Sequence, residues 1–196
     1  DDDDGGTDSG AAYVFRTSDG GASYVKVAKL TASDATSGDN FGISVAIAGD
    51  TIVVGTNNKE AVYVFLTTDD GATYGQVAKL TASDAAANDY FGRSVAISAG
   101  IIAIGAMGDV EGGGFGSGSV YLFRISPHNA AWQQLAKLTA SDAGQDDHFG
   151  RSVAIDGGVV AVGAYYDDDS GSASGSATHA SDVISRPETE KEFSRA

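Results

Sequence analysis

Short apolar runs separated by polar, glycine-rich segments follow one another along most of the chain. Within residues 91–148, the run 94–97 alternates like a half-buried strand, and the run 101–104 is continuously apolar. A polar, glycine-rich segment at 107–118 comes next, and the run 120–123 is rich in aromatic and branched residues. The pattern predicts short β-strands joined by tight turns.

The last apolar run of this stretch, residues 132–138, has a composition that also suits a helix. The corresponding segments 24–30 and 74–80 alternate with a period of two, and both follow hairpin-type turns that contain Asp-Gly. We therefore predict a strand at all three positions and four strands in each complete unit. Four short strands per repeat are typical of a β-propeller blade.

Three sequence motifs recur with one common spacing, which is 50 residues for the first step and 58 for the second. Lys-Leu-Thr-Ala-Ser-Asp-Ala begins at Lys29, Lys79 and Lys137, Phe-Gly-x-Ser-Val-Ala-Ile begins at Phe41, Phe91 and Phe149, and Tyr-(Val/Leu)-Phe begins at Tyr13, Tyr63 and Tyr121. Independent motifs that share one spacing identify a tandem repeat. Periods of about this length are typical of solenoids, propellers and arrays.

These motifs resemble the FG-GAP repeat, which builds the propeller of integrin α chains and occurs in many extracellular proteins. The resemblance covers about residues 1–176 and rests on the order of Phe-Gly-x-Ser-Val-Ala-Ile, a Val/Ile run ending in Gly-Ala, an acidic loop and Ser-Gly-Ser-Val-Tyr-Leu-Phe. It implies an all-β chain of FG-GAP-type propeller blades, each of four antiparallel strands. About three blades are present, fewer than the ~4–8 of a closed propeller. A fragment is the preferred interpretation, and an open array or a ring made from several copies are the alternatives.

The repeats divide the chain into a partial first blade with a calcium-type loop (1–40), two blades (41–90 and 91–148), the first half of a further blade (149–176) and a divergent tail (177–196). The tail is assigned because Thr178-His179-Ala180 stands where a Tyr-Val-Phe strand is expected. We expect the tail, which is polar and contains Pro187, to be disordered or weakly helical.

The resemblance also implies calcium as a cofactor, because the family often holds it in the loop between the second and third strands with an Asp-x-Asp-x-Asp-Gly-x-x-Asp pattern. Calcium takes several oxygen ligands. The matching positions are Asp2, Asp4, Gly6 through its carbonyl group, and Asp8 in the first loop, Asp109 and Glu111 in a later loop, and Asp167 and Asp169 in the last. The alternative for the first loop is a solvated acidic terminus. The second unit has lost the loop, and its Lys59 opposes a cation.

Other repeated residues point to structure rather than to chemistry. Asp34, Asp84 and Asp142 end the Thr-Ala-Ser-Asp segments, and Asp39, Asp89 and Asp147 stand two residues before each Phe-Gly pair. Their repetition predicts a structural role, such as capping exposed backbone amides at turns. The three phenylalanines of the Phe-Gly pairs are predicted to anchor the packing between blades.

Composition excludes several classes of function. The formal net charge of −15 disfavours nucleic acid and anionic membranes as partners. No apolar run reaches ~18 residues, so membrane insertion is not expected, and the absence of cysteine excludes thiol chemistry and disulfides. His128, His148 and His179 lack a metal-binding spacing and are predicted to lie on the surface. Without a nucleophile elbow or a phosphate-binding loop either, we predict no enzymatic activity.

The sequence therefore predicts a non-catalytic, calcium-assisted binding module of the adhesion type, extracellular or at a cell surface, with a protein or glycan ligand. The alternatives are a purely structural repeat segment of a larger cell-surface or matrix protein and an accessory domain of a secreted enzyme. An exposed aromatic patch outside the repeat pattern favours binding, and a surface of repeated polar residues favours a scaffold. Exposed blade edges also predict self-association.

Overall fold

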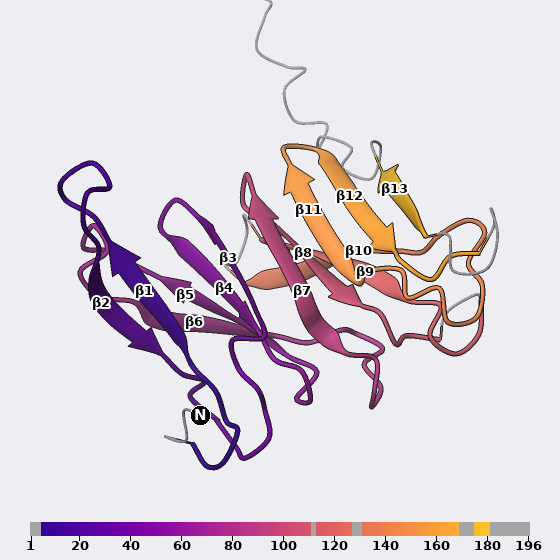
Figure 1. Ribbon diagram of the computed structural model, residues 1–196, viewed down its shortest axis with the longest axis horizontal. Helices are drawn as coiled ribbons and strands as arrows, with labels where there is room; N and C mark the ends of the chain where they lie inside the picture. The colour runs from indigo at the N-terminus through magenta and orange to yellow at the C-terminus, as the bar shows by residue number, and fades with distance from the viewer. Residues whose placement is uncertain (1–4, 111–112, 127–130, 169–174, 181–196) are drawn as a thin grey trace, which may run out of the picture.

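The computed structural model describes residues 5–110, 113–126, 131–168 and 175–180. Within these ranges the chain forms thirteen β-strands in four antiparallel sheets, which follow one another along the molecule (Figure 1). This arrangement confirms the predicted all-β chain of repeated antiparallel units. None of the described residues form a helix long and apolar enough to cross a membrane.

Each sheet is a meander of strands that are consecutive in sequence. The first sheet pairs β1 (Ala12–Arg16) with β2 (Val25–Leu30), and the second contains β3 (Ser44–Ala48), β4 (Thr51–Gly55), β5 (Val62–Leu66) and β6 (Gly75–Leu80). The third contains β7 (Phe91–Ser98), β8 (Ile101–Ala106), β9 (Ser119–Ile125) and β10 (Trp132–Leu138), and the fourth contains β11 (Ser152–Asp156), β12 (Val159–Ala164) and β13 (Ser176–Ala180). The second and third sheets are therefore complete four-stranded blades, as predicted.

Burial explains the two kinds of strand pattern in the sequence. β4 and β8 are apolar on both faces and almost wholly buried, because neighbouring sheets cover them on both sides. β6, the outermost strand of its sheet, alternates between exposed and less exposed positions. β10 alternates in a similar way and pairs with β9, which confirms that residues 132–138 form a strand and not a helix.

Three apolar clusters join successive sheets, and a phenylalanine of a Phe-Gly pair lies in each of them. The ring of Phe41 lies 5.6 Å from the ring of Tyr63 and 6.0 Å from that of Phe65. The next blade repeats this aromatic group with Phe91, Tyr121 and Phe123. Buried at 3%, 0% and 4% exposure, Phe41, Phe91 and Phe149 are confirmed as packing anchors.

The glycine of each later Phe-Gly pair lets the sheets approach closely. A Cβ atom built on Gly105 would lie 2.0 Å from the carbonyl oxygen of Gly150, and one on Gly55 would lie 1.9 Å from that of Gly92. Gly92 and Gly150 themselves have φ of +98° and +88°, a region that favours glycine. The spacing of the inner strands therefore depends on glycine in both partners.

The last sheet corrects the predicted start of the tail. β13 runs to Ala180, so a third strand occupies the first residues of the segment that was assigned to the tail. The pair Val162↔Thr178 matches Val54↔Tyr63 in the second sheet. Strand pairing uses backbone groups, so a sequence without Tyr-Val-Phe still forms the ladder. The rest of the predicted tail, residues 181–196, lies outside the described residues.

Candidate functional site

All predicted site residues belong to loops at one end of the sheets, which we call the loop rim. In an antiparallel meander, the connection from the second to the third strand and the connection to the next sheet emerge at the same end. The rim therefore comprises residues 31–43, 56–61, 81–90, 107–118, 139–151 and 165–175. Backbone hydrogen bonds join the two kinds of loop, for example from Gly108 N to Asp89 O at 3.0 Å.

The aspartates that precede each Phe-Gly pair cap backbone amides, as predicted. Asp39 Oδ2 accepts from the amide of Thr36 at 2.7 Å, and Asp89 Oδ2 accepts from that of Ala86 at 2.7 Å. Asp147 Oδ2 accepts from the amide of Gly144 at 2.6 Å. The three carboxylates are buried within the loops that lead into each blade.

Asp34 and Asp84 have a different role from the predicted amide capping, because they bind side chains of the following blade. Asp34 accepts hydrogen bonds from the Tyr63 hydroxyl at 2.5 Å and from Lys79 Nζ at 2.7 Å. In the next blade, Asp84 accepts from Tyr121 at 2.9 Å and from Lys137 at 2.6 Å. The role is structural, as expected, but it joins two blades.

The electrostatics of these contacts favour the ionised aspartate. Burial raises the pKa of Asp34, but the hydrogen bonds from Lys79 and Tyr63 and the charge of Lys59 outweigh it and lower the pKa to about 2. Burial and the nearby carboxylate raise the pKa of Tyr63 above its usual range. Lys79 also lies over the Tyr63 ring, with Nζ 5.6 Å from its centroid.

The second unit, which lacks the calcium-type loop, uses two adjacent charged residues instead. Lys59 Nζ lies 2.7 Å from Asp39 Oδ2 and also donates to the carbonyl group of Asp34, so a fixed ammonium group occupies this part of the rim. Glu60 accepts hydrogen bonds from the amides of Asn88 and Tyr90 at 3.1 Å and of Phe91 at 2.6 Å.

Glu60 was missed by the sequence analysis. Burial raises its pKa, while its hydrogen bonds to backbone amides oppose that shift. The shortened loop between β4 and β5 was the available signal, but a glutamate there looks the same as a solvated surface residue. Its partners lie 28 to 31 residues further along the chain.

In the loop of the third sheet, Asp109 is buried and already paired with a cation. Its Oδ2 lies 2.8 Å from Lys137 Nζ and 2.7 Å from the Tyr121 hydroxyl. Burial raises the pKa of Asp109, but the bonds from Lys137 and Tyr121 lower it overall. A calcium ion at Asp109 must compete with this ammonium group. The other predicted ligand, Glu111, lies outside the described residues.

The first and last loops each show one of their predicted carboxylates. Asp8 is exposed, and the carbonyl group of Gly6 accepts from the amide of Ser9 at 3.0 Å. Asp167 is buried, and its Oδ2 accepts from the Ser176 hydroxyl at 2.5 Å. Among the described residues, no group of three His, Cys, Asp or Glu is arranged to hold a metal ion. The further predicted ligands Asp2, Asp4 and Asp169 lie outside the described residues, so a calcium site at either loop depends on them.

An aromatic surface stands on the rim of the last sheet. It consists of Tyr165 and Tyr166, which are 48% and 43% exposed, with His148 and Arg151 beside them. The two tyrosine rings have centroids 3.8 Å apart, and the His148 ring is stacked 6.0 Å from Tyr165. The Arg151 guanidinium lies 6.0 Å from the centroid of Tyr165. The predicted surface position of His148 is half-buried, and His128 and the side chain of His179 are not described.

This aromatic surface is not part of the repeat. The slot of His148 holds Asn40 and Tyr90 in the preceding units, and the position of Tyr165 corresponds to Met107. The signal that could have revealed it was a pair of adjacent tyrosines after the conserved-spacing Gly-Ala of the second strand. The sequence analysis considered that segment only for calcium.

Consecutive four-stranded antiparallel blades, joined by Phe-Gly anchors and carrying their loops on one rim, define a blade-repeat protein. The FG-GAP repeat family matches residues 24–74, 74–123 and 132–177, and the chain belongs to this family. Each match begins near the fourth strand of one sheet and ends at the third strand of the next, so the sequence repeat is offset from the structural blade. FG-GAP repeats are usually non-catalytic, and the match brings no sign of a catalytic family. No curated protein was found to match the sequence.

Proposed function

We propose that the chain is a non-catalytic, extracellular binding module of the adhesion type, whose blades hold the aromatic surface in place for a protein or glycan ligand. The observation that carries the proposal is the exposure of Tyr165 and Tyr166 beside Arg151. Exposed tyrosine rings with a neighbouring arginine are enriched where proteins bind their ligands, because they offer much contact area and little flexibility. The other blades fold without these rings, so the repeat itself does not require them.

Calcium assists this module in our proposal by joining acidic side chains of the first and last rim loops. The support is the family pattern at Asp2, Asp4, Gly6 and Asp8, and the acidic run that contains Asp167 and Asp169. The proposal leaves out the loop of Asp109 and Glu111, because the Lys137 ammonium group already neutralises Asp109.

A thermal melt tests the role of calcium. We expect millimolar calcium to raise the melting midpoint relative to chelator, because a ligand that binds only the folded state stabilises it by about 2.7 kcal/mol at a hundred times its Kd. The variant Asp167→Ala plus Asp169→Ala should lose part of this rise. Its matched control, Asp50→Ala plus Asp156→Ala, removes the same charge from hairpins at the opposite end of the sheets and should keep it. A wild type with no calcium shift contradicts the calcium part of the proposal.

A binding screen tests the aromatic surface separately. The wild-type chain is applied to a glycan array and to an array of extracellular proteins, together with Tyr165→Ala and Tyr24→Ala. Tyr24 is also an exposed tyrosine, but it lies in the first hairpin, at the far end of the molecule. Binding that is lost in Tyr165→Ala and kept in Tyr24→Ala supports the proposal. Equal binding by both variants refutes the assignment of the surface.

One set of observations favours the second candidate function, a purely structural repeat segment. The repeated aspartate caps and the Tyr–Lys–Asp contacts all act within or between blades, and they account for most of the charged residues described on the rim. A chain that binds nothing on either array and still melts cooperatively indicates this structural function.

A further inference from the structure

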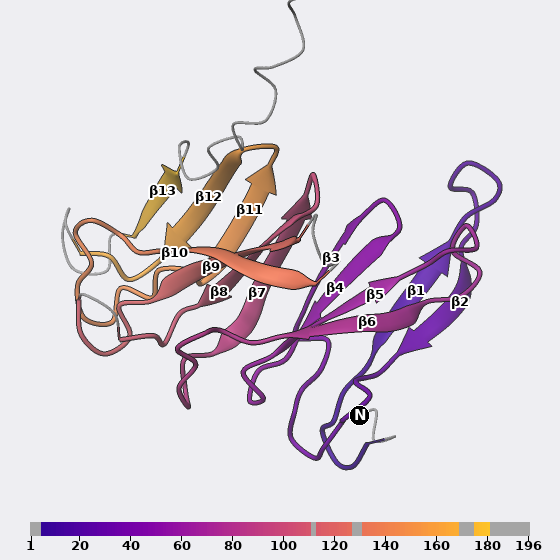
Figure 2. The same ribbon diagram turned by 180° about the vertical axis from the view of Figure 1, so that it is seen from behind.

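The two ends of the array carry complementary parts of a blade. In the described residues, the first sheet has the equivalents of a third and fourth strand, β1 and β2, and the last sheet has a first and second strand, β11 and β12, followed by β13. The sheets lie at opposite ends of the molecule in both views (Figures 1 and 2). No single chain can therefore bring these two parts together in the arrangement shown.

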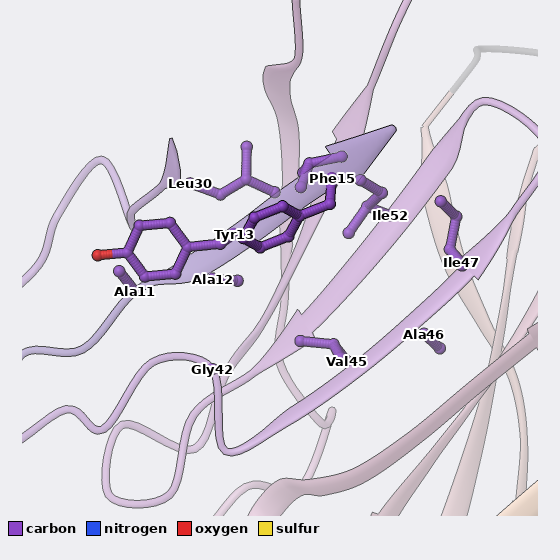
Figure 3. A pocket seen from close by; sticks show the side chains of 11 residues that line it. Ala11, Ala12, Tyr13, Phe15, Leu30, Gly42, Val45, Ala46, Ile47 and Ile52 are labelled. Carbon is purple, nitrogen blue, oxygen red and sulfur yellow. The ribbon is translucent and has the colours of Figure 1, made fainter. Parts of the chain in front are cut away.

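An apolar groove lies between β1 and β3 at the first end. It has a volume of about 430 Å³, with Tyr13 and Phe15 of β1 on one side and Val45 and Ile47 of β3 on the other (Figure 3). Within the described residues β1 pairs with β2 alone, so its second backbone edge faces this groove. Phe15, Val45 and Ile47 are 57%, 60% and 63% exposed. The groove thus combines an open strand edge with an apolar wall, which suits an added strand.

The other blades show what normally covers such a wall. Val95 and Ile97 are the equivalents of Val45 and Ile47, and they pack against the cluster that contains Val53 of the preceding sheet. In the last sheet, the equivalents Val153 and Ile155 pack against the cluster of Ile101 and Ala103. These covering residues lie on the second strand of the preceding sheet.

The matching second strand with an uncovered face is β12, at the far end. Its Val159 and Ala161 hold the positions of Ile101 and Ala103, yet Val159 is 46% exposed and Ala161 is also exposed. The wall of β3 and the face of β12 are therefore the two halves of a contact that the molecule makes internally between its other sheets.

The third strand shows the same complementarity. The sequence of β1, Ala-Tyr-Val-Phe-Arg, resembles that of β5, Val-Tyr-Val-Phe-Leu, whereas β13 reads Ser-Ala-Thr-His-Ala. Thr178 of β13 occupies the register position that is tyrosine in β5 and β9. Phe149 consequently lacks the tyrosine and phenylalanine that surround Phe41 and Phe91, and Tyr13 and Phe15 of β1 supply that pair.

A carboxylate at the far end completes the match. Tyr13 and Lys29 hold the positions of Tyr121 and Lys137, which bind Asp84 of the preceding interblade loop. The corresponding aspartate at the far end is Asp142, which is exposed. Tyr13 and Lys29 have other interactions in their own part of the chain. These do not prevent the contact, because Lys137 binds Asp84 and Asp109 at the same time.

We propose that two copies of this chain associate head to tail, with β1–β2 of one copy completing the blade that β11–β12 of the other copy begins. β1 takes the place of β13 beside β12, in the register of β5 beside β4, so that Val14 of one copy faces Ala161 of the other. Each chain then contributes the strands of about three blades, and two chains give about six, within the ~4–8 of closed propellers. Head-to-tail contacts of this kind close into a ring when the rotation per chain allows it. The proposal is independent of the ligand and calcium proposals above.

Light scattering behind a sizing column tests the association. The chain has a mass of 19.8 kDa, and we expect the wild type at tens of micromolar to have twice that mass. Phe15→Ser should be a monomer, because it places a hydroxyl group in the apolar groove. Tyr24→Ser is the matched control, since it changes an exposed aromatic residue of the same hairpin outside the groove and should remain a dimer. Circular dichroism checks that both variants are folded. A monomeric wild type, or a dimer that persists in Phe15→Ser, overturns the proposal.

Cysteine cross-linking tests the strand register. The natural chain has no cysteine, so introduced thiols report without background. A mixture of Val14→Cys chains and Ala161→Cys chains should form a disulfide-linked heterodimer, because directly opposed residues of paired strands have Cβ atoms about 4.5–5.5 Å apart. Val14→Cys mixed with Ala154→Cys, on the neighbouring strand β11, should form far less. Equal cross-linking in both mixtures, or none in the first while the dimer persists, rules out this arrangement.

Discussion

Lys137 offers the sharpest test of how the rim is held together. Its Nζ lies 2.6 Å from Asp84 Oδ2 and 2.8 Å from Asp109 Oδ2, and the side chain of Asp109 is 7% exposed. The substitution Lys137→Met keeps most of the side-chain volume and removes the charge. Two carboxylates are then left close to each other without the cation that neutralises them.

The size of the effect follows from the geometry. Because both oxygens lie near one nitrogen, about 5 Å at most separates them, and two unit charges at that distance repel by about 3 kcal/mol at an effective dielectric constant of ~20. Removal of one partner of a buried ion pair costs about 3–5 kcal/mol. Since Asp84 is 44% exposed, we expect the lower end, about 3 kcal/mol. For a chain of this length that is a fall in Tm of about 6–12 °C.

Lys79→Met is the matched control. Lys79 and its partner Asp34 are 36% and 45% exposed, and Lys59 Nζ remains 3.6 Å from Asp34 Oδ1. The loss should therefore be about 1 kcal/mol or less. Both variants are compared with the wild type by urea denaturation at one protein concentration, so that self-association is equal. If the two variants lose the same free energy of unfolding within ~0.5 kcal/mol, the argument from burial at Asp109 is refuted.

Two further predictions concern acid stability and the glycine contacts. Burial raises the pKa of Asp34, but its bonds to a lysine and a tyrosine lower it from 3.8 to about 2, so its contribution to stability is present above about pH 4 and is lost as the pH falls towards 2. Urea denaturation at pH 6 and pH 3 should show a smaller acid-induced loss for Asp34→Asn than for the wild type, and an equal loss in both contradicts the assignment. Gly105→Ala should lose at least ~2 kcal/mol of folding free energy, because its Cβ would lie 2.0 Å from the carbonyl oxygen of Gly150. Gly75→Ala, whose Cβ meets nothing within 4 Å, should change stability by less than ~0.5 kcal/mol, and similar losses in the two variants count against this account of sheet spacing.

The repeat made the architecture predictable from the sequence. Residues 132–138 alone suit a helix, but two equivalent segments with a period of two decided the matter in favour of a strand, which β10 confirms. The packing role of Phe41 and the amide cap of Asp39 were predicted for the same reason, since a residue kept in every unit serves the unit. Both contacts are also short or lie within one recurring arrangement, so a single rule describes them.

The parts that were not predicted depend on contacts between blades. Asp34 and Asp39 stand five residues apart in one turn-rich segment, yet the first binds Tyr63 and Lys79 of the next blade while the second caps a local amide. Sequence pattern alone does not show which way a carboxylate in such a loop will face. The strand at Ser176–Ala180 was missed for a related reason, since side-chain pattern was used to judge a pairing that backbone groups make.

The calcium and association proposals meet at the loop of Asp167. In the third sheet, the repeat lysine Lys137 neutralises both the interblade aspartate and the loop aspartate Asp109. The fourth sheet has no fourth strand among the described residues, so no such lysine reaches its loop from within it. In the proposed dimer, Lys29 of the second copy takes that position. A lysine and a calcium ion then serve the same acidic loop, and the calcium-induced rise in Tm should be larger for monomeric Phe15→Ser than for the wild type. A rise of equal size in both proteins separates the two proposals and shows that the association does not bring Lys29 to this loop.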